Sequence, residues 1–218
     1  MRLRQRLAAE AMGSLLLAAT VIGSGVMAQR LAGGNTAVAL LANTAATVAV
    51  LAVLITLFAP VSGAHFNPAV SLIQAVRRTL PWPEAVAYAL AQVLGCCLGA
   101  LLAHAMFELP LLQASLHVRA GPAQGLSECV ATFGLLMVVL GSRDRDAPWM
   151  VAAWIGAAYW FTASTSFANP AITIARSLSD TFAGIRPRDV PVFVIAQFLG
   201  AFAALWAAQY LFPAARRH

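Results

Sequence analysis

The sequence contains one short motif twice, as Asn67-Pro68-Ala69-Val70 and as Asn169-Pro170-Ala171-Ile172. The chain has only four asparagines, and two of them begin these motifs. Asparagine is a good N-cap, and proline is tolerated at the first helical position because its missing N–H would have no partner there. Each motif therefore predicts the start of a helix. The two segments are about ten residues long, too short to span a bilayer, so both are expected to be re-entrant half-helices.

The composition around these motifs is typical of an integral membrane protein. Of the 218 residues, 61% are hydrophobic and 10% are charged, and the mean hydropathy is +0.78. A soluble domain carries roughly 25% charged residues, so an ordinary cytosolic enzyme and a disordered protein are excluded. The net charge of +6 does not indicate nucleic-acid binding, because the arginines that carry it are scattered between long apolar stretches.

Six apolar stretches are long enough to cross a membrane, since a bilayer core needs roughly 20 apolar residues per helix. They lie near residues 7–29, 36–59, 84–107, 124–141, 148–165 and 190–212. If both termini lie inside, nine arginines fall in cytoplasmic segments and four outside, with Arg176 left out because it belongs to the second half-helix. This bias predicts cytoplasmic N- and C-termini.

The two halves of the chain repeat three features in the same order. Residues 9–17, Asn67–Val70 and 91–95 are echoed by residues 127–135, Asn169–Ile172 and 196–200. Three spans per half is an odd number, so the second half must be inverted in the membrane. We therefore expect one domain over residues 1–218, with repeat one at about 1–107, a loop at about 108–123 and repeat two at about 124–218. Inverted repeats with paired interrupted segments predict a pathway at their interface near the midplane.

The expected all-α arrangement suggests what the motifs do. Two half-helices whose N-termini meet at the membrane centre place partial positive charge on the pathway axis. Asn67 and Asn169 then have amide N–H groups to offer a passing solute oxygen. Aligned dipoles of this kind are one way in which a pore rejects protons and cations.

The sequence predicts no metal, cofactor or catalytic site. The three cysteines (Cys96, Cys97 and Cys129) lie in apolar stretches, with a spacing that fits neither a disulfide framework nor a zinc site. No nucleophile–base or metal-ligand constellation is evident either. An intramembrane enzyme is therefore disfavoured.

These residues resemble the aquaporin and glycerol-facilitator (major intrinsic protein) family. The stretch from Ser62 to Val70 is similar to that family's first box almost letter for letter, and the likeness extends to Glu10, Glu128, Gln92, Gln197 and the six-span layout. The resemblance implies a homotetramer in membrane lipid, with one pore per subunit that conducts small neutral solutes passively. It also implies a multi-pass protein of the cell inner (plasma) membrane.

One position departs from the family pattern. Most members have an arginine directly after the second motif, at the outer constriction, whereas this chain has Ile172. Offsets from the motif asparagines place the other constriction positions at Thr47, Ala157 and Ser166. Water-selective members usually have a large aromatic residue and a histidine where Thr47 and Ala157 stand. The hypothesis is a wider, less polar filter that admits solutes larger than water.

Arg176 lies four residues beyond Ile172, so the two share a helical face about 6 Å apart. A pore-facing Arg176 would place a positive charge in the outer vestibule and favour anions or strongly polar solutes there. The alternative is an ion pair with Asp180 at i+4.

Three further titratable residues have two interpretations each. In the family interpretation, Glu10 and Glu128 are braces that accept backbone N–H bonds from the re-entrant loops; the alternative is a proton relay, which would need partner groups. His65 lies two residues before Asn67 at the inner vestibule, where it either lines the pore or gates it with pH.

The leading hypothesis is thus a passive channel for water, glycerol and other small polyols, or neutral metalloid hydroxides such as arsenous acid. Because some bacterial members without the filter arginine look like arsenical conduits, and residues 165–169 are similar to theirs, methylated arsenicals are included. The alternative from another class is a proton-coupled secondary transporter, for which Glu10, Glu128 and His65 are the only candidate coupling residues. A structural protein with a closed pore is a third.

Overall fold

Residues 1–212 are described by the computed structural model, and their regular structure is entirely helical. The long helices are α1 (Leu3–Leu31), α2 (Thr36–Ser62), α4 (Trp82–Met106), α5 (Pro122–Gly141), α6 (Ala147–Phe161) and α8 (Val190–Leu211). The short ones are α3 (Pro68–Val76), α7 (Pro170–Arg176) and a 3-10 turn at Pro187–Asp189. The predicted all-α membrane fold is confirmed. Arg216 and Arg217, which entered the orientation count, lie outside the described residues.

The predicted span at 148–165 is too long. Helix α6 has 15 residues and ends at Phe161, and it is the one long helix among the described residues that does not reach the length of a membrane span. Thr162 has an extended backbone, and its hydroxyl donates to the Ala158 carbonyl oxygen at 2.6 Å. The residues from Thr162 to Ala168 therefore form an irregular segment that leads to α7.

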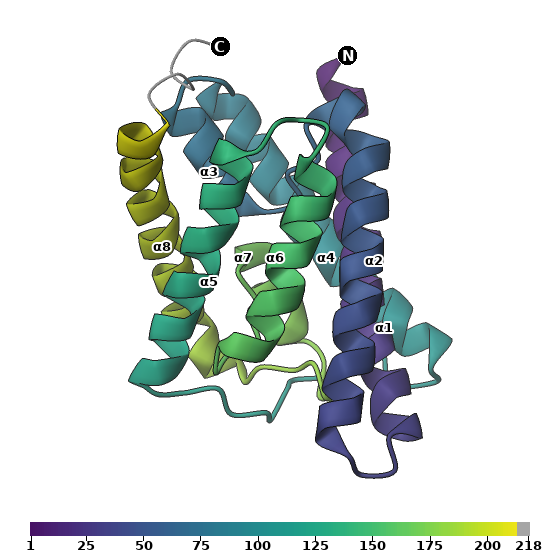
Figure 1. Cartoon of the computed structure of the whole chain (residues 1–218). Helices are drawn as coiled ribbons and strands as arrows, with labels where there is room; N and C mark the ends of the chain where they lie inside the picture. The colour runs from purple at the N-terminus through teal and green to yellow at the C-terminus, as the bar shows by residue number, and fades with distance from the viewer. Residues whose placement is uncertain (213–218) are drawn as a thin grey trace.

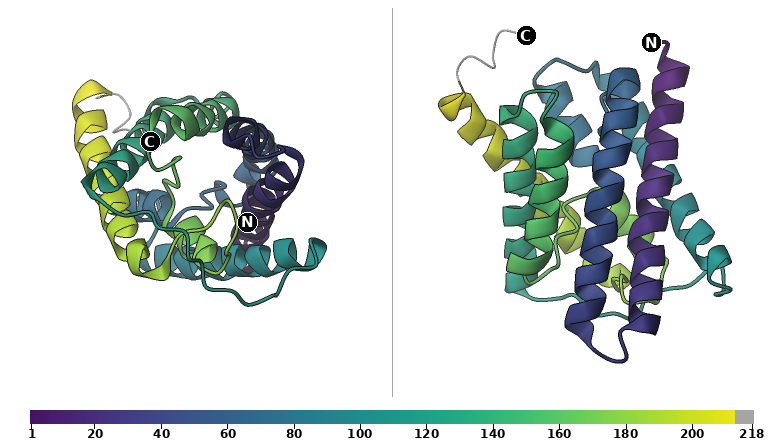
Figure 2. Two further views of the ribbon diagram at one scale, coloured as in Figure 1. Left: turned by 90° about the horizontal axis from the view of Figure 1, so that it is seen from below. Right: turned by 45° about the vertical axis from the view of Figure 1, so that its right-hand side comes forward.

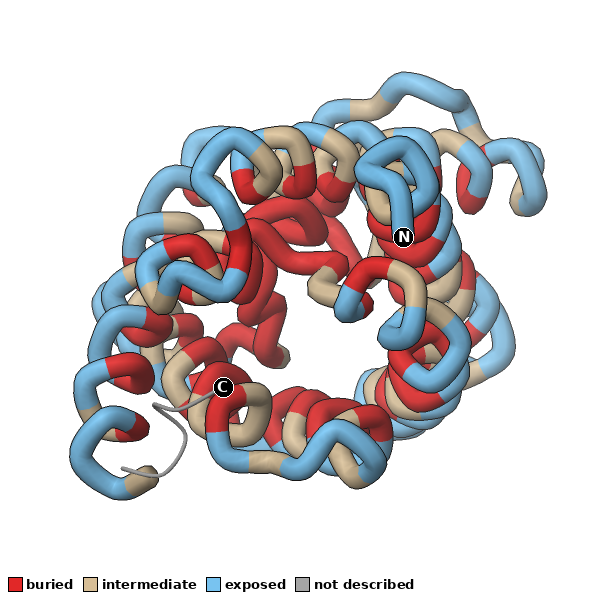
Figure 3. The backbone as a smooth tube through the Cα atoms, turned by 90° about the horizontal axis from the view of Figure 1, so that it is seen from above, coloured by how far each residue is buried: buried red, intermediate tan, exposed pale blue. Residues whose placement is uncertain are grey.

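The half-helices lie inside a ring of the longer ones. Seen along the bundle axis, the long helices surround a centre that α3 and α7 enter (Figure 2, left). Helix α1 begins and α8 ends at the same end of the bundle, as an even number of crossings requires (Figure 1). We call this the terminal end and the opposite one the distal end. Buried backbone gathers on the inner side of the ring and in the central segments (Figure 3).

The two repeats are held by equivalent helix pairs, α1 with α4 and α5 with α8. The close approach depends on a glycine in each pair. A Cβ atom on Gly95 of α4 would overlap the carbonyl oxygen of Ala11, and one on Gly200 of α8 would overlap that of Cys129. Small residues let membrane helices approach this closely, because only van der Waals contact and hydrogen bonds hold helices together in lipid.

This packing predicts that Gly200→Ala destabilises the protein by about 1–3 kcal/mol, the usual cost of overpacking, although alanine favours the helix itself. The measurement is the apparent Tm in detergent. The matched control is Gly125→Ala on α5, where the new Cβ would meet only Val192 Cγ1 at an ordinary 3.6 Å. An unchanged or higher Tm for Gly200→Ala would show that the helix pair does not need the glycine.

Candidate pore and its lining

The two Asn-Pro-Ala motifs begin the half-helices in the same way. The side-chain oxygen of Asn67 accepts a hydrogen bond from the Ala69 N–H at 2.9 Å. That of Asn169 accepts from the N–H groups of Ala171 at 2.9 Å and Ile172 at 3.3 Å. Both prolines occupy the first helical position, where no N–H is needed. Both caps are therefore satisfied within their own repeat.

The same asparagines also join the two repeats to each other. The Asn67 amide donates to the carbonyl oxygen of Ala168, and the Asn169 amide donates to that of Phe66, each at 2.8 Å. Each of these bonds uses one of the two N–H groups of a primary amide. Both asparagines line the central cavity.

The loops that precede the motifs have unusual backbone conformations at matching positions. Ala64 and Phe66 have φ of 50° and 48°, and their counterparts Ser166 and Ala168 have φ of 50° and 48°. A left-handed conformation at a non-glycine residue costs about 1–3 kcal/mol and persists only where the surroundings hold it.

Glu10 and Glu128, both fully buried, hold these loops. The Glu10 carboxylate accepts from the backbone N–H groups of His65 at 3.0 Å and Phe66 at 2.7 Å. The Glu128 carboxylate accepts from those of Phe167 and Ala168, each at 2.9 Å. Side-chain donors complete each set: Ser62 and Gln92 on Glu10, and Gln197 on Glu128. Both carboxylates are thus occupied by donors, and the loops find inside the protein the acceptors that lipid cannot supply.

The central cavity has a volume of about 780 Å³ and extends from the terminal end past both motifs. At the terminal end it is lined by Asp144, Arg145 and Trp149, and its far limit is at Ser166 and Arg176. Its walls are mostly apolar: Leu17, Val21, Leu51, Ile55, Val70, Leu135, Val151, Ile155 and Ile172. Such a lining offers few hydrogen bonds apart from those at the motifs and at the far limit.

Of the four filter positions expected from the sequence, Thr47, Ser166 and Ile172 line the cavity. The placement of Ala157 is wrong, because its side chain is exposed on the outside of the chain. On α6 the cavity is lined instead by Val151, Ile155 and Tyr159. These three residues recur every four positions and share one helical face. Ala157 is two positions from Ile155 and from Tyr159, so its side chain is turned by about 200° from theirs and points away from the cavity.

Tyr159 is therefore a lining residue that the sequence argument missed. It is 3% exposed, and its hydroxyl lies 3.3 Å from the hydroxyl of Thr47 on α2. The Thr47 hydroxyl in turn donates to the Asn43 carbonyl oxygen at 2.9 Å. The four-residue spacing of Val151, Ile155 and Tyr159 was the available signal.

His65 lies at the cavity wall on the terminal side of the motifs. Its Nδ1 is 3.0 Å from the Ser71 hydroxyl, and its ring makes an edge contact with Tyr88 at 5.3 Å between centroids. These contacts tie the imidazole to α3 and α4.

Arg176, the last residue of α7, also reaches the cavity wall. Its Nε donates to the Ala183 carbonyl oxygen, and its guanidinium lies over the Phe167 ring, 3.3 Å from the centroid. The alternative of a helical ion pair with Asp180 is wrong, because α7 ends at Arg176 and Asp180 accepts the Leu116 N–H at 2.8 Å instead. Among residues 1–212, no ion pair is formed by Arg176.

A second arginine, Arg119, joins the same region from the loop between α4 and α5. Its side chain donates to the carbonyl oxygens of Gly184 at 2.8 Å and Ser164 at 3.0 Å. By its position in the sequence it is one of the four arginines expected outside, and nothing local indicates that its loop folds inward.

In the described part of the chain, no group of three His, Cys, Asp or Glu side chains is placed to hold a metal ion.

Comparison with known proteins identifies the family. A sequence model described as Major intrinsic protein matches residues 1–159. The chain belongs to this family. A protein named aquaglyceroporin AqpS from Rhizobium meliloti is 55% identical over 217 residues, which cover 98% of this chain and 93% of that protein. A probable aquaporin named AqpM from Archaeoglobus fulgidus is 31% identical over 176 residues, which cover 73% of this chain and 72% of that protein.

A solved structure supports the fold. The X-ray structure of the aquaglyceroporin from Plasmodium falciparum matches with a TM-score of 0.73, covering 98% of this chain and 99% of that one, at 19% sequence identity. The predicted aquaporin-like fold is therefore confirmed. Members of the major intrinsic protein family are channels, so this protein is an integral membrane channel for water or small solutes and not an enzyme.

The hydrogen bonds of Glu128 predict the effect of Glu128→Gln. Each carboxylate oxygen of Glu128 accepts one backbone N–H, whereas a glutamine side chain has only one oxygen. The substitution therefore leaves the N–H of Phe167 or of Ala168 facing an amide NH₂ group. An unsatisfied buried donor costs about 1–3 kcal/mol, and we expect a lower apparent Tm and reduced solute flux at every pH. The measurements are detergent melting and proteoliposome flux with and without a pH gradient.

The control for this substitution is Glu108→Gln, at an exposed position of the loop after α4. It removes the same charge without touching a re-entrant loop and should match the parent protein. A Glu128→Gln protein that melts normally and loses only gradient-driven flux would contradict the brace and favour a relay.

Proposed function

We propose that this protein is a passive channel that admits small uncharged solutes larger than water. The candidate solutes are glycerol and other small polyols, neutral metalloid hydroxides such as arsenous acid, and methylated arsenicals. The observation that carries the proposal is Ile172 at the cavity wall, in the position where most family members have an arginine. An apolar branched side chain there leaves the passage without that fixed donor and charge.

The polar groups that remain suit neutral solutes. Asn67 and Asn169 each offer an amide N–H, and the positive ends of two half-helices disfavour cations at the same place. The apolar walls fit the carbon skeleton of a polyol. The name of the relative from Rhizobium meliloti, an aquaglyceroporin, agrees with this solute class.

The main alternative is proton-coupled transport, and the geometry gives it less support. A coupling carboxylate must bind and release protons along the pathway, whereas Glu10 and Glu128 are fully buried and accept bonds from donors in their own repeat. Flux that is insensitive to a pH gradient is therefore expected.

We further propose that the channel is a homotetramer in the lipid of the inner (plasma) membrane, with both termini cytoplasmic. The distribution of arginines supports the orientation. The outer faces of the ring carry exposed apolar side chains suited to lipid or to another subunit, such as Leu90, Leu94 and Leu98 on α4 and Ile195, Leu199 and Trp206 on α8.

The test is stopped-flow light scattering on proteoliposomes, with a sucrose gradient for water and a glycerol gradient for solute. Ile172→Arg should lower glycerol flux about tenfold or more while sparing water, because a barrier increase of about 1.4 kcal/mol suffices for a tenfold change. The larger charged side chain narrows the passage beside Thr47 and Ser166.

Two control variants locate the effect. Ile172→Val keeps an apolar branched side chain and should conduct glycerol like the parent. Ala157→Val, on the outside of α6, should also leave glycerol flux unchanged. Arsenous acid uptake is measured next if glycerol enters. A parent protein that moves only water, or an Ile172→Arg protein with normal glycerol flux, would refute the wide filter.

A further inference from the structure

The far limit of the cavity contains two polar atoms that lack a partner. Arg176 and Ser166 are each 2% exposed, and both line the cavity. Among the described residues, neither Nη1 of Arg176 nor the hydroxyl oxygen of Ser166 forms a hydrogen bond. Buried polar groups in native structures are nearly always paired, so such orphans need an explanation. One guanidinium nitrogen and one hydroxyl in the wall of the cavity thus have no partner in the described part of the chain.

Phe167 connects the two residues. It follows Ser166 directly in the chain, and the guanidinium of Arg176 stacks on its ring at 3.3 Å. Arg119 lies over the same ring, with its guanidinium carbon 5.0 Å from the centroid. The two guanidinium carbons are therefore no more than about 8 Å apart, close enough for their charges to add at the cavity wall.

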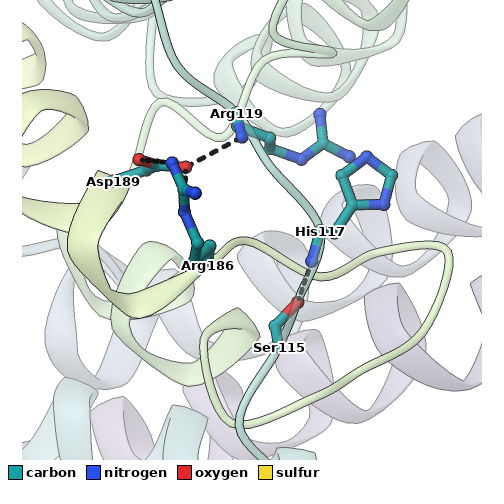
Figure 4. Close-up of polar contacts among 5 residues, drawn as sticks. All are labelled: Ser115, His117, Arg119, Arg186 and Asp189. Atoms are coloured by element: carbon teal, nitrogen blue, oxygen red, sulfur yellow. Dashed lines mark hydrogen bonds and ion pairs between the residues drawn. The ribbon is translucent and has the colours of Figure 1, made fainter.

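Among the described residues, the nearby carboxylates form no ion pair with these two arginines, although Glu128 offsets part of their charge. Glu128 accepts hydrogen bonds from Phe167, Ala168 and Gln197, and Asp180 accepts the Leu116 N–H. Asp189 is ion-paired with Arg186 at 2.9 Å and accepts the backbone N–H of Arg119, not its guanidinium (Figure 4). No ion pair in residues 1–212 involves Arg119 or Arg176.

The charges of the two arginines act on a neighbouring histidine. Burial first, and then the charges of Arg119 and Arg176, lower the pKa of His117, while the charge of Asp180 opposes this shift. Figure 4 shows the His117 ring beside the Arg119 guanidinium. Burial also lowers the pKa of Arg119 to about 10, which still leaves it charged at neutral pH.

We propose that Arg176 and Ser166 form a binding site for a small monovalent oxyanion, such as a carboxylate, in the wall of the pore. Arg176 Nη1–H donates to one oxygen and the Ser166 hydroxyl to another, and Arg119 adds charge from behind Phe167. Hydrogen bonds to an ionised acceptor are roughly twice as strong as neutral ones. The site takes the conjugate base of a small oxyacid, a ligand class that a filter for neutral solutes does not provide for.

The test is saturation-transfer difference NMR with formate as the probe, on the purified full chain in a maltoside detergent. The buffer contains no carboxylate, phosphate or sulfate. The parent protein should saturate formate, and Arg176→Gln should weaken the apparent affinity at least tenfold. Arg30→Gln is the matched control: Arg30 lies on the outside at the end of α1, donates to the Phe107 carbonyl oxygen and stacks on the Phe107 ring, so the same charge is lost away from the cavity.

Ser166→Ala keeps the test decisive if Arg176→Gln does not fold. The Ser166 hydroxyl has no partner to lose, and alanine already occupies the equivalent backbone conformation at Ala64. We expect a several-fold weaker formate affinity with an unchanged melting temperature. Equal formate affinity in the parent and in folded Arg176→Gln or Ser166→Ala would overturn the proposal, as would an equal loss in Arg30→Gln.

The result is separable from the neutral-solute channel, because formate binding is measured without any flux. A protein that binds formate through Arg176 but excludes glycerol would refute the proposed function alone. A glycerol channel whose formate signal does not depend on Arg176 would refute the oxyanion site alone.

Discussion

The structure depends on supplying hydrogen-bond acceptors to irregular backbone at the centre of a membrane. Lipid offers none, so every N–H of the re-entrant loops must be satisfied by the protein itself. Glu10 and Glu128 do this from α1 and α5, the first helix of each repeat. A carboxylate suits the task because it accepts several bonds at once, and the bonds to its ionised oxygens offset much of the cost of burying its charge.

The half-helices follow from that arrangement. Once the loops are held, Asn67 and Asn169 cap α3 and α7, and each donates to the loop of the other repeat. The two repeats thus fix each other at the point where the pore passes between them. Gly95 and Gly200 allow the outer helix pairs to close tightly enough for these contacts to form. The result is a central section with mostly apolar walls.

The distal side of that section differs chemically from the rest. Ile172 lines the cavity with an apolar side chain, and Arg176, one helical turn further along, brings a guanidinium to the cavity limit. The guanidinium groups of Arg176 and Arg119 both lie over the ring of Phe167, so one aromatic side chain contacts both cations.

The membrane class, the half-helices and the internal repeat were predictable from the sequence, because apolar length, Asn-Pro caps and recurring motifs are local properties of the chain. Offsets from the two motifs, within the family resemblance, predicted Thr47, Ser166 and Ile172 at the filter, and Arg176 was left open between the vestibule and an ion pair with Asp180. The choice of Tyr159 over Ala157 at the cavity was not predictable, since helix packing sets the rotation of α6 and each residue turns the face by about 100°. The inward folding of the Arg119 loop depends on contacts with residues 45 or more positions away, and no local pattern encodes it.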